Sequence, residues 1–179
     1  MKPSLLALAI LTALRLAVLP AAAQTIPPVK AKALDGSEVV LPQPDSPHYL
    51  ILTIGFSHKS GQPSSAWGKR LVAEYSSNPH VAIYQLAELE AAPSFIRGMI
   101  LHGMRKDVPE AQHSHFLPLF DHEEQWKKLV NFSGPDDAYI LLTTPDGRVL
   151  WQTHGPVEDS ACAELKAVVA KSTAEASKR

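Results

Sequence analysis

The segment YLILTIGFSHKSGQPSSAW, Tyr49–Trp67, contains the strand, the loop and the helix start that decide the fold. Its first part belongs to an almost wholly apolar run over residues 48–56, which predicts a strand that is buried on both faces. After the polar loop, Ser64 or Ser65 can cap a helix. The apolar side of this helix repeats every four residues, at Trp67, Leu71 and Tyr75. A loop between such a strand and such a helix often carries the chemistry of an α/β protein.

Residues 1–23 have the pattern of a secretory signal peptide. Lys2 supplies the positive charge, an apolar stretch follows over residues 5–18, and the small residues 21–23 precede the expected cleavage position. Arg15 interrupts the apolar stretch and argues against an uncleaved membrane anchor, because a transmembrane helix needs about 20 apolar residues with few charges. We therefore expect an exported protein, either periplasmic or secreted.

The remainder of the chain, residues 24–179, has the size of one ordinary domain. Loss of the basic Lys2 and Arg15 with the signal peptide changes the formal net charge from −1 to −3. This nearly balanced charge provides no basic surface for nucleic acid, so we expect no nucleic-acid partner. Cys162 is the only cysteine, and the chain therefore cannot form an intramolecular disulfide.

The order of the predicted elements indicates an α/β domain. Residues 24–47 should form an N-terminal extension with a short β-hairpin at Asp35-Gly36, residues 48–171 the main domain, and residues 172–179 a disordered tail. Strands that alternate with helices predict a parallel core, and Pro145-Asp146-Gly147 predicts a closing antiparallel hairpin. Beyond the opening strand and helix, we expect strands at residues 81–86, 116–120, 139–144 and 148–152, and helices at residues 94–106, 123–132 and 157–171.

The second half of the chain carries a family resemblance. Phe120-Asp121 after a short strand, a helix, Tyr139–Leu142, Asp146–Val149 and then Gly155 follow one another in that order. This layout resembles the exported thioredoxin-like oxidoreductases of the redoxin type, and the resemblance covers residues 30–170. It implies a thioredoxin-like fold, in which a central mixed sheet has helices on both faces and ends with an antiparallel hairpin.

The resemblance also implies what the loop after the first buried strand should contain. Redox-active members carry Cys-x-x-Cys there, at a helix N-terminus where the macrodipole and the amide groups lower the pKa of the thiol. Here Gly61-Gln62-Pro63-Ser64 takes that position, with Pro63 retained and no sulfur. The family's cis-proline, which faces the cysteines, is replaced at Asp137 or Ala138. A serine hydroxyl cannot exchange with a disulfide, so we expect a protein without catalytic residues and without redox activity.

A second, local resemblance suggests a role. Phe56-Ser57 and Ser65-Ala66-Trp67, Ile96–Ile100 and Tyr139–Trp151 resemble the mitochondrial ATP synthase assembly factors, which are non-enzymatic thioredoxin-like proteins. The resemblance implies an assembly or chaperone-like factor that binds a protein client, such as an envelope or membrane protein. Methionine and arginine are favoured at such interfaces, although an ordinary amphipathic helix would explain those on helix 94–106 equally well. The candidate contact residues are His58, Lys59, Arg97, Met99, Met104 and Arg105.

Two other functions stay open. His113 and His115 would face the same side of an extended segment and, with His102 upstream, could bind copper or zinc as a carrier does. A polar loop with solvated histidines explains the same residues, and a calorimetric copper or zinc titration distinguishes the two hypotheses. Cys162 could act as a redox thiol on another protein, although a free cysteine at an apolar helix position is usually a small buried hydrophobe.

Overall fold

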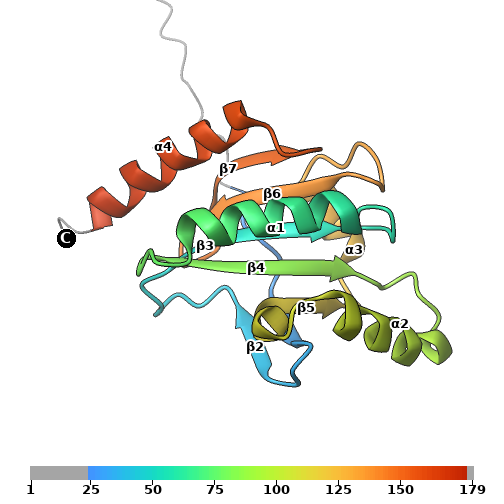
Figure 1. Ribbon diagram of the computed structural model, residues 1–179. Coiled ribbons are helices and arrows are strands. Elements are labelled where there is room, and N and C mark those ends of the chain that lie inside the picture. The colour runs from blue at the N-terminus through green and yellow to red at the C-terminus, as the bar shows by residue number, and fades with distance from the viewer. Residues whose placement is uncertain (1–23, 177–179) are drawn as a thin grey trace, which may run out of the picture.

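Five strands form the central sheet of the computed structural model, which describes residues 24–176 (Figure 1). The strand order is β5-β4-β3-β6-β7, with parallel pairing among β3, β4 and β5 and antiparallel pairing of β6 with both β3 and β7. The strands are β3 (Tyr49–Gly55), β4 (Val81–Glu88), β5 (Phe116–Leu119), β6 (Ala138–Thr143) and β7 (Val149–His154). This order confirms the predicted mixed sheet with its closing antiparallel hairpin. The predicted signal peptide lies outside the described residues.

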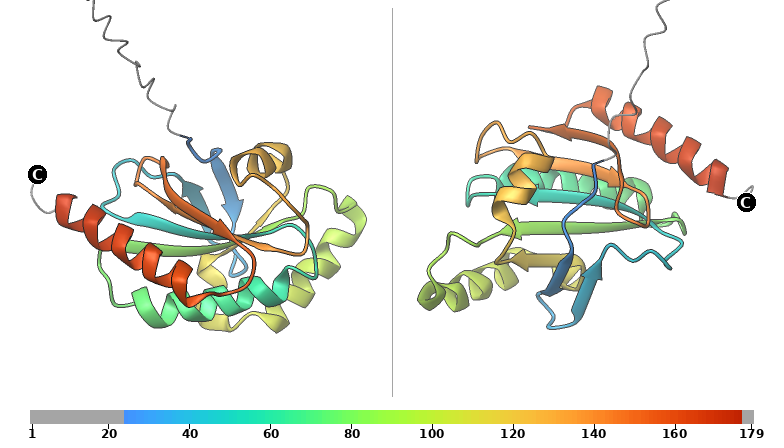
Figure 2. Two further views of the ribbon diagram at one scale, coloured as in Figure 1. Left: turned by 90° about the horizontal axis from the view of Figure 1, so that it is seen from above. Right: turned by 180° about the vertical axis from the view of Figure 1, so that it is seen from behind.

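Helices cover both faces of the sheet, as the sequence predicts (Figure 2). The helices α1 (Gly61–Tyr75) and α4 (Asp159–Ala176) lie on one face. The other face carries α3 (Glu123–Leu129) and a separate two-stranded sheet, which consists of β1 (Val29–Lys32) and β2 (Glu38–Leu41). No helix of the described chain is long and apolar enough to cross a membrane.

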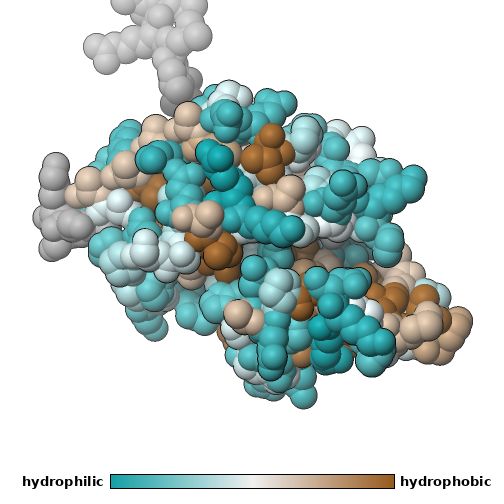
Figure 3. Space-filling model, viewed as in Figure 1, coloured by the Kyte–Doolittle hydropathy of each residue, from teal (hydrophilic) through white to brown (hydrophobic). Residues whose placement is uncertain are grey.

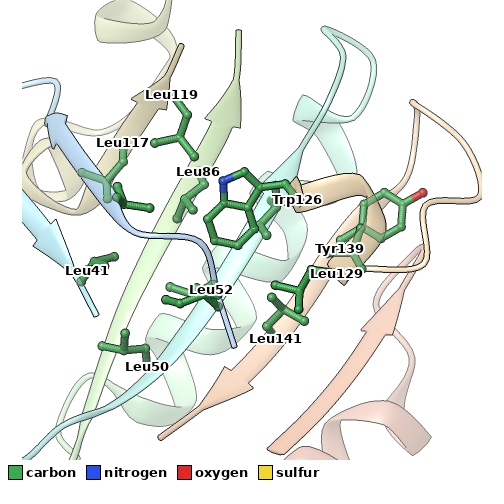
Figure 4. Packing of buried hydrophobic residues seen from close by; sticks show 14 of the residues in the cluster. Leu41, Leu50, Leu52, Leu86, Leu117, Leu119, Trp126, Leu129, Tyr139 and Leu141 are labelled. Atoms are coloured by element: carbon green, nitrogen blue, oxygen red, sulfur yellow. The ribbon is translucent and has the colours of Figure 1, made fainter. Parts of the chain in front are cut away.

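The alternation of side chains along β3 separates two hydrophobic cores. Leu50, Leu52 and Ile54 join the core beneath α3, whereas Ile51 joins the core beneath α1 and α4. Trp126 fills the first core, packed among leucines from several strands (Figure 4), and Trp67 fills the second. Burial of each large apolar side chain contributes about 1.5–3 kcal/mol, so an uncharged strand with both faces covered is strongly fixed in place.

One helix departs from the predicted packing. The sequence predicts an apolar side on α2 (Ser94–Asp107), yet no residue of this helix is buried. Phe95 is 86% exposed and Met99 is 70% exposed. The reason is position: α2 follows the end of β4 and lies beyond the edge of the sheet, so it covers neither face (Figure 1). Its apolar residues appear as a brown and tan patch at the right of Figure 3.

The C-terminal helix is longer than the sequence predicts. We expect a helix that ends at residue 171 and a disordered tail, but α4 continues to Ala176. Alanine and glutamate in this stretch favour helix, and the hydroxyl of Thr173 donates a hydrogen bond to the Val169 carbonyl at 2.9 Å. Those preferences are enough to extend the helix beyond its packed part.

Candidate functional site

The loop between β3 and α1 is closed by two serines that bind each other. The backbone N–H of Ser57 donates to Ser60 Oγ at 3.2 Å, and the backbone N–H of Ser60 donates to Ser57 Oγ at 3.1 Å. Ser60 Oγ also donates to the Ser57 carbonyl at 2.7 Å. Ser60 is 1% exposed, so the turn that leads into α1 is buried as well as hydrogen-bonded. This arrangement holds the loop in one conformation.

The helix begins at Gly61, directly after Ser60, and the predicted Gly61-Gln62-Pro63-Ser64 forms its first turn. A Cβ atom on Gly55 would lie 2.6 Å from Ser60 Oγ and 3.2 Å from Ser64 Oγ, so both hydroxyls face the end of β3. Ser64 Oγ is buried without a hydrogen-bond partner. The start of α1 therefore presents two hydroxyl groups. The predicted cap at Ser64 or Ser65 is wrong, because the helix starts before both residues and its N-cap residue is Ser60. The point where a loop becomes a helix has no periodic signal.

The segment before β6 faces this loop, as the resemblance implies. Asp136 accepts a hydrogen bond from Ser57 Oγ at 3.1 Å and lies 3.5 Å from Lys59 Nζ. The adjacent Asp137 lies 2.9 Å from His154 Nδ1, and Ala138 is fully buried at the start of β6. An aspartate pair thus lies beside the position where the family carries its proline. The contact joins residues far apart in sequence, so no local pattern could have predicted it.

A pocket of about 640 Å³ opens beside the loop. The loop forms one wall, the end of β4 forms the floor, and the C-terminal end of α2 forms the opposite wall. Polar groups on the loop side therefore face a mixed wall, in which Asp107 accompanies the apolar Met104, Val108 and Pro109. Among its lining residues are His58, Lys59, Ser64, Gln85, Met104 and Val108.

A second hollow of about 540 Å³ continues along β4 and shares Gln85 with the first. Gln85 Nε2 donates to the Ser64 carbonyl at 3.0 Å, which fixes the side chain between the two hollows. A Cβ atom on Gly68 would collide with the Gln85 amide. Glycine at position 68 thus leaves room for the side chain that links β4 to the first turn of α1.

The structure divides the six predicted contact residues into two groups. His58, Lys59 and Met104 line the pocket, and Met99 projects from α2 into solvent. The two arginines instead have partners within the chain. Arg97 donates to the Ala92 carbonyl at 2.9 Å, with its guanidinium 4.6 Å from the ring centre of Phe120.

Arg105 has a comparable internal role. Its Nε donates to the Leu34 carbonyl at 2.8 Å, which ties α2 to the turn between β1 and β2. Leu34 is 2% exposed, so the carbonyl belongs to a buried residue. Together with Arg97, Arg105 positions α2. Because Arg105 remains an exposed residue, its role as a contact residue stays a prediction, as does that of Arg97.

The sequence predicts an extended segment around His113 and His115, and this prediction is wrong. His113 and His115 lie in η1 (Glu110–His115), a 3₁₀-helix, and residues two apart on such a helix do not face the same side. His113 Nε2 lies 2.9 Å from the Val108 carbonyl, and the His115 ring packs 5.3 Å from the ring of Tyr84. Within residues 24–176, these two and the exposed His102 do not form a three-ligand cluster. Copper or zinc binding stays a prediction.

Cys162 lies in α4, within the core shared with α1, and is 5% exposed. Burial raises the pKa of its thiol, which disfavours the reactive thiolate. The residue is not part of the pocket beside the loop. This environment fits the buried hydrophobe that the sequence indicates and counts against a thiol that acts on other proteins.

No family model and no curated protein matches this chain. Several solved structures are similar to it. A thiol-disulfide oxidoreductase from Bacteroides fragilis superimposes with a TM-score of 0.55 at 16% identity, covering 81% of this chain and 99% of that one. The exposed lipoprotein thioredoxin of Streptococcus pneumoniae gives a TM-score of 0.52 at 12% identity over 79% and 98% of the two chains.

A third similar structure is BsSco, a member of the Sco family of cytochrome c oxidase assembly proteins, with a TM-score of 0.53, 17% identity and coverage of 80% and 92%. At these identities the similarity establishes the fold alone. The chain has a thioredoxin-like fold, as the order of its elements predicts.

Proposed function

We propose that this chain is an exported thioredoxin-like protein that binds a protein partner and does not catalyse thiol–disulfide exchange. The observation that carries the proposal is the start of α1, where the hydroxyls of Ser60 and Ser64 are turned toward the end of β3 and the loop contains no sulfur. Disulfide exchange requires attack by a thiolate, which a serine cannot supply. The single thiol of the chain, Cys162, is buried elsewhere.

The pocket has the chemistry of a site for a protein segment. His58 and Lys59 can donate hydrogen bonds from the loop, while Met104 and Val108 offer apolar surface on the opposite wall. Binding sites for peptides combine apolar area with a few oriented polar groups, and methionine adapts its shape to different partners. The exposed Phe95 and Met99 extend the apolar surface beyond the pocket along α2. A role in assembly has a precedent in this fold, because BsSco is a member of a family of assembly proteins.

The redox half of the proposal is tested by reduction of insulin disulfides with dithiothreitol as electron source. We expect the purified protein to leave the uncatalysed rate unchanged, because its loop contains no thiol. A Cys162→Ser variant serves as the control and should behave identically. Turnover by the wild type that disappears in this variant would overturn the proposal and restore Cys162 as a redox residue.

The binding half is tested by site-specific photo-crosslinking in the native cell envelope. A photoreactive side chain at Lys59 lies beside the pocket, whereas one at the exposed Lys128 lies on α3, across the sheet. We expect a discrete crosslinked species from position 59 that is absent from position 128 and is displaced by excess unlabelled protein. Equal crosslinking at both positions, or none at either, would contradict the proposed contact surface.

A further inference from the structure

Three glutamates meet where β4 ends and α3 begins. Glu88 is the last residue of β4, Glu90 follows in the next loop, and Glu123 is the first residue of α3. One carboxylate oxygen from each lies within 4.8 Å of the others. Backbone groups hold the set together, because the N–H of Glu90 donates to Glu88 Oε1 at 2.9 Å and the N–H of Glu123 donates to Glu90 Oε2 at 2.8 Å.

Glu88 is the unusual member of this set. Glu88 is only 6% exposed, and its Oε2 atom is buried without a hydrogen-bond donor. A buried carboxylate oxygen that receives no hydrogen bond is costly unless a proton or a cation satisfies it.

Lys127, which pairs with Glu123, does not supply a cation to Glu88. Lys127 Nζ lies 2.7 Å from Glu123 Oε1 and 3.3 Å from Glu124 Oε1, so it pairs with two glutamates of α3. Within the described chain, Glu88 and Glu90 have no ion-pair partner. Glu88 and Glu90 therefore bring carboxylate oxygens to the cluster without an ion-pair partner among the described residues.

We propose that Glu88, Glu90 and Glu123 bind a calcium ion. All three ligands are oxygens, which hard cations such as Ca²⁺ and Mg²⁺ prefer over the softer transition metals. Ca²⁺ binds oxygen at about 2.3–2.6 Å and accommodates irregular geometry, whereas Mg²⁺ requires about 2.0–2.1 Å and a near-ideal octahedron. The three carboxylates come from a strand end, a loop and a helix start, and two of them already accept backbone hydrogen bonds, so an ion that accommodates irregular geometry suits them better. Bound there, the ion would join the end of β4 to the start of α3 and fix the segment that leads into α2.

The test is calorimetric titration of the chelator-treated protein with CaCl₂, together with its thermal unfolding in the presence and absence of the salt. We expect one site per chain with a Kd of about 10⁻⁴–10⁻³ M, the range of extracellular calcium modules, and a higher Tm in calcium. Glu124→Gln is the matched control, since Glu124 is the exposed neighbour on the same helix and lies outside the cluster. This variant should keep both the binding heat and the rise in Tm.

Glu88→Gln should lose the site, but a change at a buried position can also alter folding. The double variant Glu90→Gln/Glu123→Gln provides a second route, because glutamine at position 90 keeps an oxygen to accept the Glu123 N–H. Without calcium it should still unfold in one cooperative transition, and with calcium it should show no rise in Tm. No binding heat up to about 10 mM CaCl₂, tenfold above the weak end of that range, would overturn the proposal, as would unchanged affinity in the double variant. Equal affinity for Mg²⁺ would overturn the assignment to calcium.

Discussion

At the scale of single residues, Gly68 and Gln85 connect the packing of α1 to the candidate site. Gln85 reaches the Ser64 carbonyl only because Gly68 has no side chain. We expect Gly68→Ala to be less stable than Gly98→Ala by about 1–3 kcal/mol, the cost of overpacking. Both changes gain up to about 1 kcal/mol of helix propensity, but a Cβ on Gly98 meets nothing within 4 Å.

Urea unfolding of the two variants measures this difference. A further Gln85→Ala change should remove the penalty of Gly68→Ala, because the colliding amide is gone. Equal stabilities of the Gly68→Ala and Gly98→Ala variants would show that Gln85 moves aside without cost.

The sequence could locate the loop and its lack of sulfur, but not the residues that face one another across it. Gly61–Ser64 lies in the first turn of α1, close to where the resemblance implies the redox motif. The start of α1 at Gly61 was not predicted, because it has no periodic signal, and neither was the contact of Ser57 with Asp136, which joins residues 79 apart in the chain. Period-2 reasoning failed for His113 and His115, since the helical turn that follows Pro109 changes the direction of both side chains.

At the scale of elements, α2 is attached by a few polar contacts and by a side that is only half-buried, with Ile96, Ile100 and Met104. We expect Arg105→Ala to loosen α2, because the change removes the hydrogen bond to the carbonyl of the buried Leu34. Loss of a partner for a buried acceptor costs about 1–3 kcal/mol, and the apolar residues that remain to hold the helix are at most half-buried. Hydrogen exchange followed by mass spectrometry should show faster exchange across residues 94–107. The exposed Lys106 gives the matched control, and equal exchange in Lys106→Ala and Arg105→Ala would argue against the anchor.

The same helix shows the limit of periodicity. An apolar stripe at helical spacing predicted that α2 exists, and the bounds of the helix agree closely with the expected 94–106. The pattern cannot predict which element covers the apolar stripe, and in this fold the central sheet does not bury it. By contrast, β3 and β6 were predictable because uninterrupted apolar runs of strand length require cover on both faces.

At the scale of the whole molecule, Cys162 reports the opening of the core between α1 and α4. Its thiol is buried and its pKa is raised, so a thiol reagent can react only after α4 separates from the sheet or the domain unfolds. We expect native protein to react with a maleimide far more slowly than protein unfolded in guanidinium, at a rate that rises with urea in parallel with unfolding. Cys162→Ser, the control, should take up no reagent. Immediate stoichiometric labelling under native conditions would contradict the buried position and would again make Cys162 a candidate for chemistry on a second protein.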